Sequence, residues 1–364
     1  MLALRGRGGP QAEREAIDML SFREFLDTFG EAYPPRMRYD GDDSPESFLA
    51  WRRQFLAKLE ELSGEPFAVR HREDSSPPAP RRVELLDTEE LDDHVREHVA
   101  IESVMGTTIT AYVLVPKGEA RGPRPGVLAL HGHSRDGKEV IAGALPSQEG
   151  RPPSDHGRAA VRAGFVVLCP DWWGWGERAE EGFDFDGRDM CNVKFMAAGM
   201  YGIPLLSLMI NDAQAALDAL VARPDVDPTR VAALGNSFGG RMSMYLAAFD
   251  ERVRCAVCSG CLNCFRERSL KLTSCGAQFF PGMLRWGDVE DVFALIAPRP
   301  LMIMTGRTDP LLPHEYVARM KPVIERAYRA LGALDNLAFY DHEGGHFLPQ
   351  GPALDWLKRQ FDLG

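Results

Sequence analysis

The sequence lacks the features that would assign it to a membrane, to export or to a nucleic acid. No apolar run reaches the roughly 18 residues that a membrane-spanning helix needs. The opening stretch, MLALRGRGGPQAEREAIDML, has Arg and Gly where a signal peptide would need an unbroken apolar core. Lys and Arg number 42 against 53 Asp and Glu, a formal net charge of −11, so no basic excess exists to neutralise phosphates. We therefore expect a cytoplasmic protein that binds neither membranes nor nucleic acids.

Cysteine is too scarce for a disulfide framework: the chain of 364 residues has seven, an odd number. Four of them lie three apart in CAVCSGCLNC, residues 255–264, a spacing that suggests an iron–sulfur or zinc site. The first half of this stretch is predicted to be a buried strand. Residues three apart on a strand point to opposite faces, so Cys255 and Cys258 cannot share a metal. We expect free thiols that act as small hydrophobes, and neither metal nor cofactor.

The chain divides at its one low-complexity stretch, EDSSPPAPRR, and contains no internal repeat. Residues 1–80 are predicted to be a helical extension, because SPESFLAWRRQFLAKLEELSG carries one apolar stripe between a capping Ser44 and a terminating Gly64. Residues 81–364 alternate apolar runs with amphipathic stretches, which is typical of a mostly parallel sheet flanked by helices. About eight strands are predicted, beginning with an antiparallel pair that turns at Gly106. This pattern fits an α/β-hydrolase sheet.

The pentapeptide GNSFG lies between the predicted strand RVAAL and the predicted helix FGGRMSMYLAAF. In such a strand–turn–helix context the serine, Ser237, has a strained backbone and an exposed hydroxyl, and Gly235 and Gly239 avoid collisions across the turn. The string alone is weak evidence, but its context predicts that Ser237 is a nucleophile. The alternative is a glycine-rich helix cap whose serine only satisfies a backbone donor.

A serine nucleophile needs a base to take its proton and a carboxylate to orient that base. TGRTDPLLP places Asp309 after the next-to-last predicted strand, and YDHEGGHF places His346 after the last one. Both positions lie at the edge of the sheet where sites in α/β proteins gather. Asp341 and Glu343 are the rival acids.

The segment HEGGH, residues 342–346, also matches the HExxH zinc motif. That motif requires a helix that presents both histidines on one face. Here two adjacent glycines follow an apolar strand, and each glycine costs about 1 kcal/mol in a helix interior. We therefore assign His346 to the serine and not to zinc.

Two backbone amides are expected to bind the oxyanion of the reaction. One belongs to Phe238, the first residue of the helix after the nucleophile, and the other to His133 in the loop HGHS. A metal site at His131 and His133 is the alternative interpretation, although no acidic cluster accompanies them.

A long irregular stretch, residues 173–203, is predicted to form a lid or substrate wall. The candidate substrate-contacting side chains are Trp173, Trp175, Phe280 and Met283. Tryptophan in a glycine-rich loop is also typical of packing, so that interpretation stays open.

With GNSFG, HGH, TGRTDP and GGHF in this order, the chain resembles the α/β-hydrolase superfamily, and within it the dienelactone hydrolase and acetyl xylan esterase-like group. More particular matches are DHGRAAVRAGFVVLCPDWWGWGER and PGMLRWGDVEDVFALIAPRPLMIMTGRTDP. The resemblance covers residues 95–364, approximately. It implies a catalytic triad of Ser237, Asp309 and His346. It also implies an oxyanion hole made by the backbone amides of His133 and Phe238. Such families hydrolyse carbohydrate acetyl esters, lactones and amides, and some cleave carbon–carbon bonds, so substrate is not fixed.

We expect a serine esterase that cleaves a small soluble acyl ester, a lactone or an acetylated sugar through an acyl-enzyme on Ser237. The lack of a visible export signal argues against polymeric xylan as the substrate. One alternative is the same triad acting on an amide, a peptide or a carbon–carbon bond. Another is a noncatalytic or metal-binding protein that uses the Cys255–Cys264 cluster. The expected partner is a small-molecule ester, and self-association into a homo-oligomer is left open.

Overall fold

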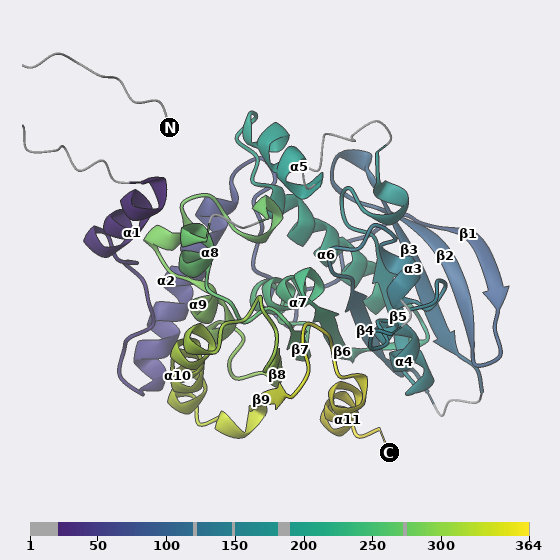
Figure 1. The fold of residues 1–364 in the computed structure, drawn as a ribbon. Helices are drawn as coiled ribbons and strands as arrows, with labels where there is room; N and C mark the ends of the chain where they lie inside the picture. Colours follow the sequence, from purple (N-terminus) through teal and green to yellow (C-terminus); the bar gives the residue numbers. More distant parts are fainter. Residues whose placement is uncertain (1–20, 119–121, 148–149, 181–189, 272–274, 364) are drawn as a thin grey trace, which may run out of the picture.

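The computed structural model describes residues 21–118, 122–147, 150–180, 190–271 and 275–363 (Figure 1). These residues form one sheet whose nine strands are β1 (Val83–Glu90), β2 (His94–Glu102), β3 (Thr108–Pro116), β4 (Arg124–Leu130), β5 (Val166–Pro170), β6 (Val226–Asn236), β7 (Cys255–Ser259), β8 (Leu301–Gly306) and β9 (Leu337–His342). Their order is β1-β2-β3-β5-β4-β6-β7-β8-β9. The first three strands and β5 pair antiparallel, and all pairs from β5 to β9 are parallel. The predicted mostly parallel sheet is confirmed.

The sheet has nine strands where about eight were predicted, and the additional strand is β1. Its sequence, VELLDTEE, is rich in acids, and every residue in it is exposed. An edge strand without a buried face has no apolar alternation, which is the signal by which strands are recognised in a sequence. The antiparallel pair β2 and β3, by contrast, turns at Gly106 as predicted.

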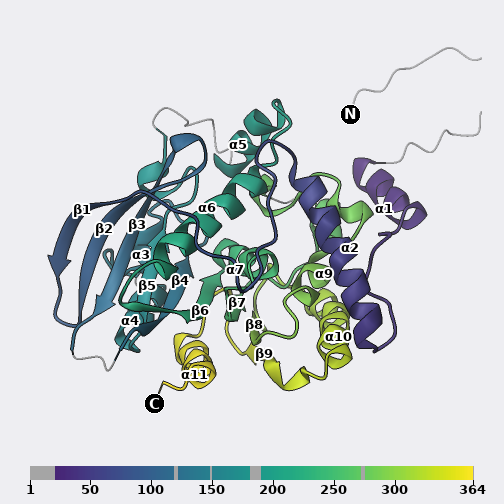
Figure 2. The same cartoon turned by 180° about the vertical axis from the view of Figure 1, so that it is seen from behind.

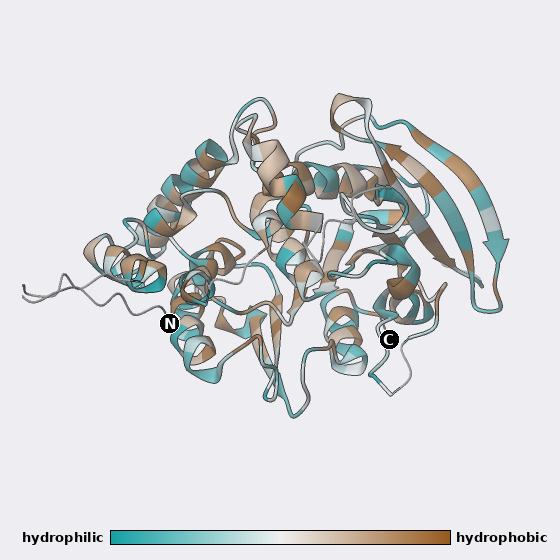
Figure 3. Ribbon diagram, turned by 45° about the horizontal axis from the view of Figure 1, so that its top comes forward, coloured by the Kyte–Doolittle hydropathy of each residue, from teal (hydrophilic) through white to brown (hydrophobic). Residues whose placement is uncertain are grey.

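Helices cover both faces of the sheet, so the molecule has three layers (Figures 1 and 2). One apolar core lies between the sheet and the helices α2 (Pro45–Ser63), α6 (Leu205–Val221), α7 (Phe238–Phe249), α9 (Val289–Ala294) and α10 (His314–Ala330). A second core lies under α3 (Lys138–Ile141), α4 (His156–Arg162) and α11 (Gln350–Gln360). Figure 3 shows the banding of polar and apolar residues on the outer strands, where one face is open to water.

The predicted helices of the N-terminal region are present as α1 (Phe22–Ala32) and α2. Ser44 caps α2 by accepting a hydrogen bond from the Ser47 amide, and Gly64 ends the helix at φ 72°. The apolar stripe of α2 packs into the core, while α1 lies against α8 (Phe265–Leu270). Residues 1–20 of the predicted helical extension and residues 181–189 of the predicted lid or substrate wall lie outside the described residues. The helix α5 (Met190–Gly199) follows the second of these.

The loops that carry the candidate residues all leave the carboxyl ends of parallel strands. His133 follows β4, Ser237 follows β6, Asp309 follows β8 and His346 follows β9. Because β4, β6, β7, β8 and β9 are neighbours in the sheet, these loops meet at one edge. None of the helices in the described parts of the chain is both long and apolar enough to span a bilayer.

Candidate active site

Ser237 occupies a sharp turn between β6 and α7. Its φ of 60° and ψ of −121° lie outside the regions that non-glycine residues favour, and its amide donates a hydrogen bond to the Ser259 carbonyl at 2.9 Å. A Cβ on Gly235 would lie 2.4 Å from the Gly239 carbonyl carbon, and one on Gly239 would lie 2.0 Å from the Leu130 carbonyl oxygen. The turn therefore requires both glycines, and it holds the serine in a strained backbone conformation.

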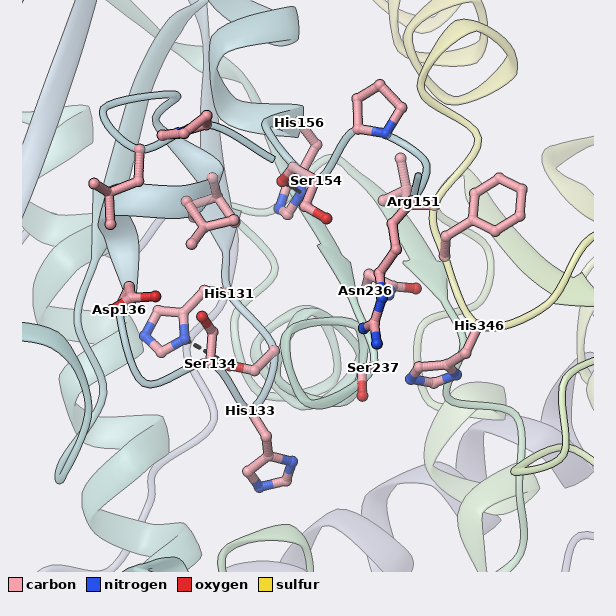
Figure 4. Close-up of a pocket in the computed structure, with 18 residues that line it drawn as sticks. His131, His133, Ser134, Asp136, Arg151, Ser154, His156, Asn236, Ser237 and His346 are labelled. Atoms are coloured by element: carbon pink, nitrogen blue, oxygen red, sulfur yellow. Dashed lines mark hydrogen bonds between the residues drawn. The ribbon is translucent and has the colours of Figure 1, made fainter. Parts of the chain in front are cut away.

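Asp309 and His346 contact each other beside this turn. The carboxylate Oδ2 of Asp309 lies 2.6 Å from His346 Nδ1, and its Oδ1 accepts the Leu311 amide at 2.8 Å. The other ring nitrogen of His346, Nε2, is buried and has no hydrogen-bond partner among the described residues. Figure 4 shows the His346 ring next to Ser237, and both side chains line the same cavity. The Ser259 hydroxyl donates to the Phe347 carbonyl at 3.1 Å and ties the histidine loop to the sheet.

The rival acids lie elsewhere. Asp341 contacts Thr305 and accepts two hydrogen bonds from Lys321 Nζ, at 2.8 and 2.9 Å. Glu343 is exposed and pairs with Arg307 at 3.2 Å. Neither carboxylate contacts a ring nitrogen of His346.

The HEGGH segment does not form a helix, so its histidines do not share a helical face. His342 ends β9, and His346 follows a loop of bends. Nδ1 of His342 accepts the Gly344 amide at 3.2 Å, and its ring packs on Phe347. The geometry that the zinc motif needs is absent from this segment.

Hydrogen bonds of His131 hold the loop after β4 in place. Its Nε2 accepts the Trp172 amide at 3.2 Å, and its Nδ1 donates to the Gly132 carbonyl at 2.7 Å. The Trp172 indole in turn donates to the His131 carbonyl at 3.1 Å. This neutral tautomer is fully bonded, and complete burial lowers the pKa of His131 to about 4. The backbone amides of His133, in this loop, and of Phe238 donate no hydrogen bond to any described residue.

Ser237 lines two cavities. The first, of about 490 Å³, runs under the loop after β4 and has mixed walls that include Ile141, Leu145 and Arg151. The second, of about 520 Å³, runs toward α5 and α8. Both are lined by Ser237, His133 and His346.

The four side chains predicted to contact substrate line neither cavity. Phe280 and Met283 are buried in the core, because the chain packs them against Tyr245 on α7. Trp175 lies behind His133, with ring centroids 5.5 Å apart, and donates to Cys191. Trp173 stacks under Arg178, whose guanidinium carbon lies 4.2 Å from the ring centroid. These four residues are therefore corrected to packing positions, and Asn192 of α5 is the side chain that the described part of the insertion contributes to a cavity.

The comparison with protein families agrees with this architecture. Residues 11–347 match the model of the Abhydrolase family. The chain belongs to this family.

Individual relatives of this abhydrolase carry hydrolase and esterase names. A protein of Bacillus subtilis (strain 168), YtaP, provisionally named a hydrolase, is 30% identical over 275 residues, which cover 74% of this chain and 88% of that protein. A Bacteroides fragilis structure, provisionally named an acetyl xylan esterase, superposes with a TM-score of 0.72 at 19% identity, covering 93% of this chain and 89% of that one. A glucuronoyl esterase from Solibacter usitatus superposes with a TM-score of 0.62 at 17% identity, covering 87% and 94%. The two structural likenesses show the fold.

The stretch that contains Cys255, Cys258, Cys261 and Cys264 does not converge on one point in this abhydrolase. Cys255 faces the core under α11, and Cys258 faces the opposite core, as predicted for residues three apart on a strand. None of the seven cysteines forms a disulfide bond, and all are buried. Burial raises the pKa of Cys255 and Cys264 to about 12, as expected for thiols that serve as packing groups.

A different group of side chains has the spacing of metal ligands, and no local motif marks it. The ligand atoms of His133, Cys191 and Cys275 lie within 4.8 Å of one another. His133 Nε2 is 3.3 Å from Cys275 Sγ, and Cys191 Sγ accepts the Trp175 indole N–H at 3.3 Å. One imidazole and two sulfurs suit a tetrahedral zinc ion with a fourth position open. The contact with Cys275, together with burial, raises the pKa of Cys191, which opposes the thiolate that a metal would need.

Two arginines in the second cavity were also missed. Arg241 lies one helical turn after Ser237 on α7, and Arg268 lies on α8. The available signal for Arg241 was its position four residues after Ser237, on the helix that Ser237 precedes. No local pattern marks Arg268, because α8 reaches the cavity only through the tertiary fold.

Proposed function

We propose that this abhydrolase is a serine hydrolase of carboxylic esters, with Ser237 as nucleophile, His346 as base and Asp309 as the acid that orients it. One observation carries the proposal. A serine at a positive-φ turn shares a cavity with a histidine whose far nitrogen bonds a buried carboxylate and whose near nitrogen has no partner in the described structure. This is the constellation that activates a hydroxyl at neutral pH.

The reaction proceeds in two halves. Nε2 of His346 removes the Ser237 proton as Oγ attacks the ester carbonyl, and the resulting oxyanion accepts hydrogen bonds from the amides of His133 and Phe238. Nε2 then gives the proton to the departing alkoxide, which leaves an acyl-enzyme on Ser237. Water attacks this second ester with the same base, and the acid and the free serine are released. Asp309 holds Nδ1–H, so that Nε2 has its lone pair toward the serine.

The proposed substrate is a small soluble acyl ester, a lactone or an acetylated sugar. Cavities of about 490 and 520 Å³ suit a small molecule, and the esterase names of the structural neighbours support ester chemistry. Seven cysteines, none in a disulfide bond, support a reducing, cytoplasmic setting for this reaction.

Ser237→Ala tests the nucleophile. We expect kcat for 4-nitrophenyl acetate to fall by at least about 10³-fold, and labelling by a fluorophosphonate probe to disappear. Ser269→Ala, on the surface of α8, is the matched control and keeps both properties. Unchanged specific activity in Ser237→Ala would refute the assignment.

The bond type is tested on a panel of esters, aminoacyl anilides and diketones, with intact-mass detection of the covalent intermediate. The proposal requires an adduct equal in mass to the acyl group, formed from esters and absent in Ser237→Ala. Turnover of anilides or diketones without turnover of esters would replace ester hydrolysis by one of the other triad reactions.

A further inference from the structure

The second cavity at Ser237, which we call the arginine cavity, is lined by two cationic side chains and by no acidic side chain of the described residues. The cations are Arg241 and Arg268, and the walls also carry Asn192, Asn263 and Gln278. A cavity that holds buried positive charge without a counter-charge of its own is unfavourable when empty of an anion.

Arg241 is a fixed charge at the base of this cavity. It is 1% exposed, its Nη2 donates to the Asn263 carbonyl at 3.1 Å and to the Asn263 side chain, and its guanidinium lies over the Phe265 ring at 4.8 Å. Its Nε is buried and has no hydrogen-bond partner in the described structure. The nearby acid Asp288 is occupied, since it accepts the amides of Phe265 and Arg266 at 2.7 and 3.2 Å.

Arg268 is the unpaired charge. Its guanidinium makes no hydrogen bond or ion pair within the described ranges, and its Nε is buried. Its helix neighbours differ: Glu267 pairs with Lys271, and Arg266 pairs with Asp27 at 3.2 Å. Burial and the charge of Arg241 lower the pKa of Arg268, while Glu267 and Asp309 act in the opposite direction. Asp309 is not available as a partner, because it is bonded to His346.

We propose that Arg268, with Arg241 behind it, binds a carboxylate of the substrate, so that this abhydrolase prefers esters carrying a second, free carboxylate. The proposal rests on the proposed function, since it places the charged substituent in the cavity that Ser237 and His346 share. A guanidinium with an unused fork matches a carboxylate in a bidentate geometry. The Gln278 side-chain amide in the wall of this cavity supplies a further donor for its oxygens.

Two matched substrate pairs test which side of the ester carries the charge. Mono-4-nitrophenyl adipate is compared with methyl 4-nitrophenyl adipate for the acyl side, and 4-acetoxybenzoate with methyl 4-acetoxybenzoate for the alcohol side. Each kcat/KM is divided by the rate of alkaline hydrolysis of the same ester, which removes differences in leaving group. In at least one pair we expect the free carboxylate to raise the normalised kcat/KM by about tenfold or more.

Arg268→Gln removes the charge and is expected to bring that ratio to about one. Arg266→Gln is the control. Arg266 lies on the same helix but pairs with Asp27 and does not line the arginine cavity, so this variant should keep the ratio. Binding of monomethyl adipate is measured by calorimetry with the same substitutions on a Ser237→Ala background, so that no ester is hydrolysed, and it should weaken by about tenfold with Arg268→Gln only.

The outcomes separate this inference from the proposed function. If ester cleavage depends on Ser237 but the ratio is about one in both pairs, the proposed function stands and the carboxylate site is refuted. The same conclusion follows if the ratio is unchanged in Arg268→Gln. If no ester is cleaved in a Ser237-dependent way, the proposed function fails, and the calorimetric comparison still decides whether Arg268 binds a carboxylate.

Discussion

Asp309 Oδ2 and His346 Nδ1 lie 2.6 Å apart, and this contact joins the loops after two neighbouring parallel strands. The carboxylate is almost fully buried, and its second oxygen is held by the Leu311 amide at 2.8 Å. The imidazole is therefore fixed in orientation, with its opposite nitrogen directed to the cavity of Ser237. The consequences of this contact can be measured.

Asp309→Asn should lower kcat for 4-nitrophenyl acetate by roughly 10³- to 10⁴-fold. The amide presents N–H to Nδ1 and so favours the tautomer in which Nε2 carries the proton and cannot act as a base. The measurement is steady-state turnover, with Ser237→Ala as the lower limit.

The matched control is Asp341→Asn, which removes the charge of the rival acid. Asp341 contacts Thr305 and Lys321 and not His346, so its variant should keep kcat within about threefold. A larger loss in Asp341→Asn than in Asp309→Asn would reassign the acid.

Gly235→Ala should destabilise the fold by about 2–4 kcal/mol. The added Cβ would lie 2.4 Å from the Gly239 carbonyl carbon, which is backbone and cannot rotate away. Gly351→Ala is the control, because its Cβ meets nothing within 4 Å on α11, and it should stabilise the fold by about 0.5 kcal/mol. Urea unfolding of both variants measures the difference, and equal stability of the two would contradict the tight turn.

His131 should remain neutral well below the usual histidine range. Burial lowers its pKa from 6.5 to about 4, so the neutral form is favoured by the folded state. Its contribution to stability is present above pH 6.5 and is lost as pH falls toward 4, by roughly 3 kcal/mol at most. Long-range ¹H–¹⁵N spectra should show the Nδ1–H tautomer from pH 7.5 to 5.5, because Nε2 accepts the Trp172 amide. A ring titration with a midpoint near 6.5 would contradict this environment.

All seven cysteines should react with a thiol reagent, but only after the protein is unfolded. Every one of them is buried, and none forms a disulfide bond. A thiol reagent at pH 8 should label less than one thiol per native chain within minutes, and seven per chain in guanidinium chloride without reductant. Five thiols under the denaturing condition would reveal a disulfide bond.

The sequence by itself determined the sheet and the order of the site. The apolar runs of β4 to β8 identified buried parallel strands, and GNSFG with its flanking strand and helix identified the turn at Ser237, because these signals are local. The edge strand β1 was not predicted for the same reason. All of its residues are exposed, so its sequence lacks the alternation of apolar and polar residues that indicates a strand.

The tertiary structure alone decided which side chains surround the serine. Phe280 and Met283 looked like walls but pack into the core, whereas Arg268 on a short helix far along the chain reaches the cavity. It also brought Cys191 and Cys275 to His133 from three separate segments. Local periodicity says which face of an element is buried. It does not say which distant loop covers that face, because this depends on how the layers close over the carboxyl edge of the sheet.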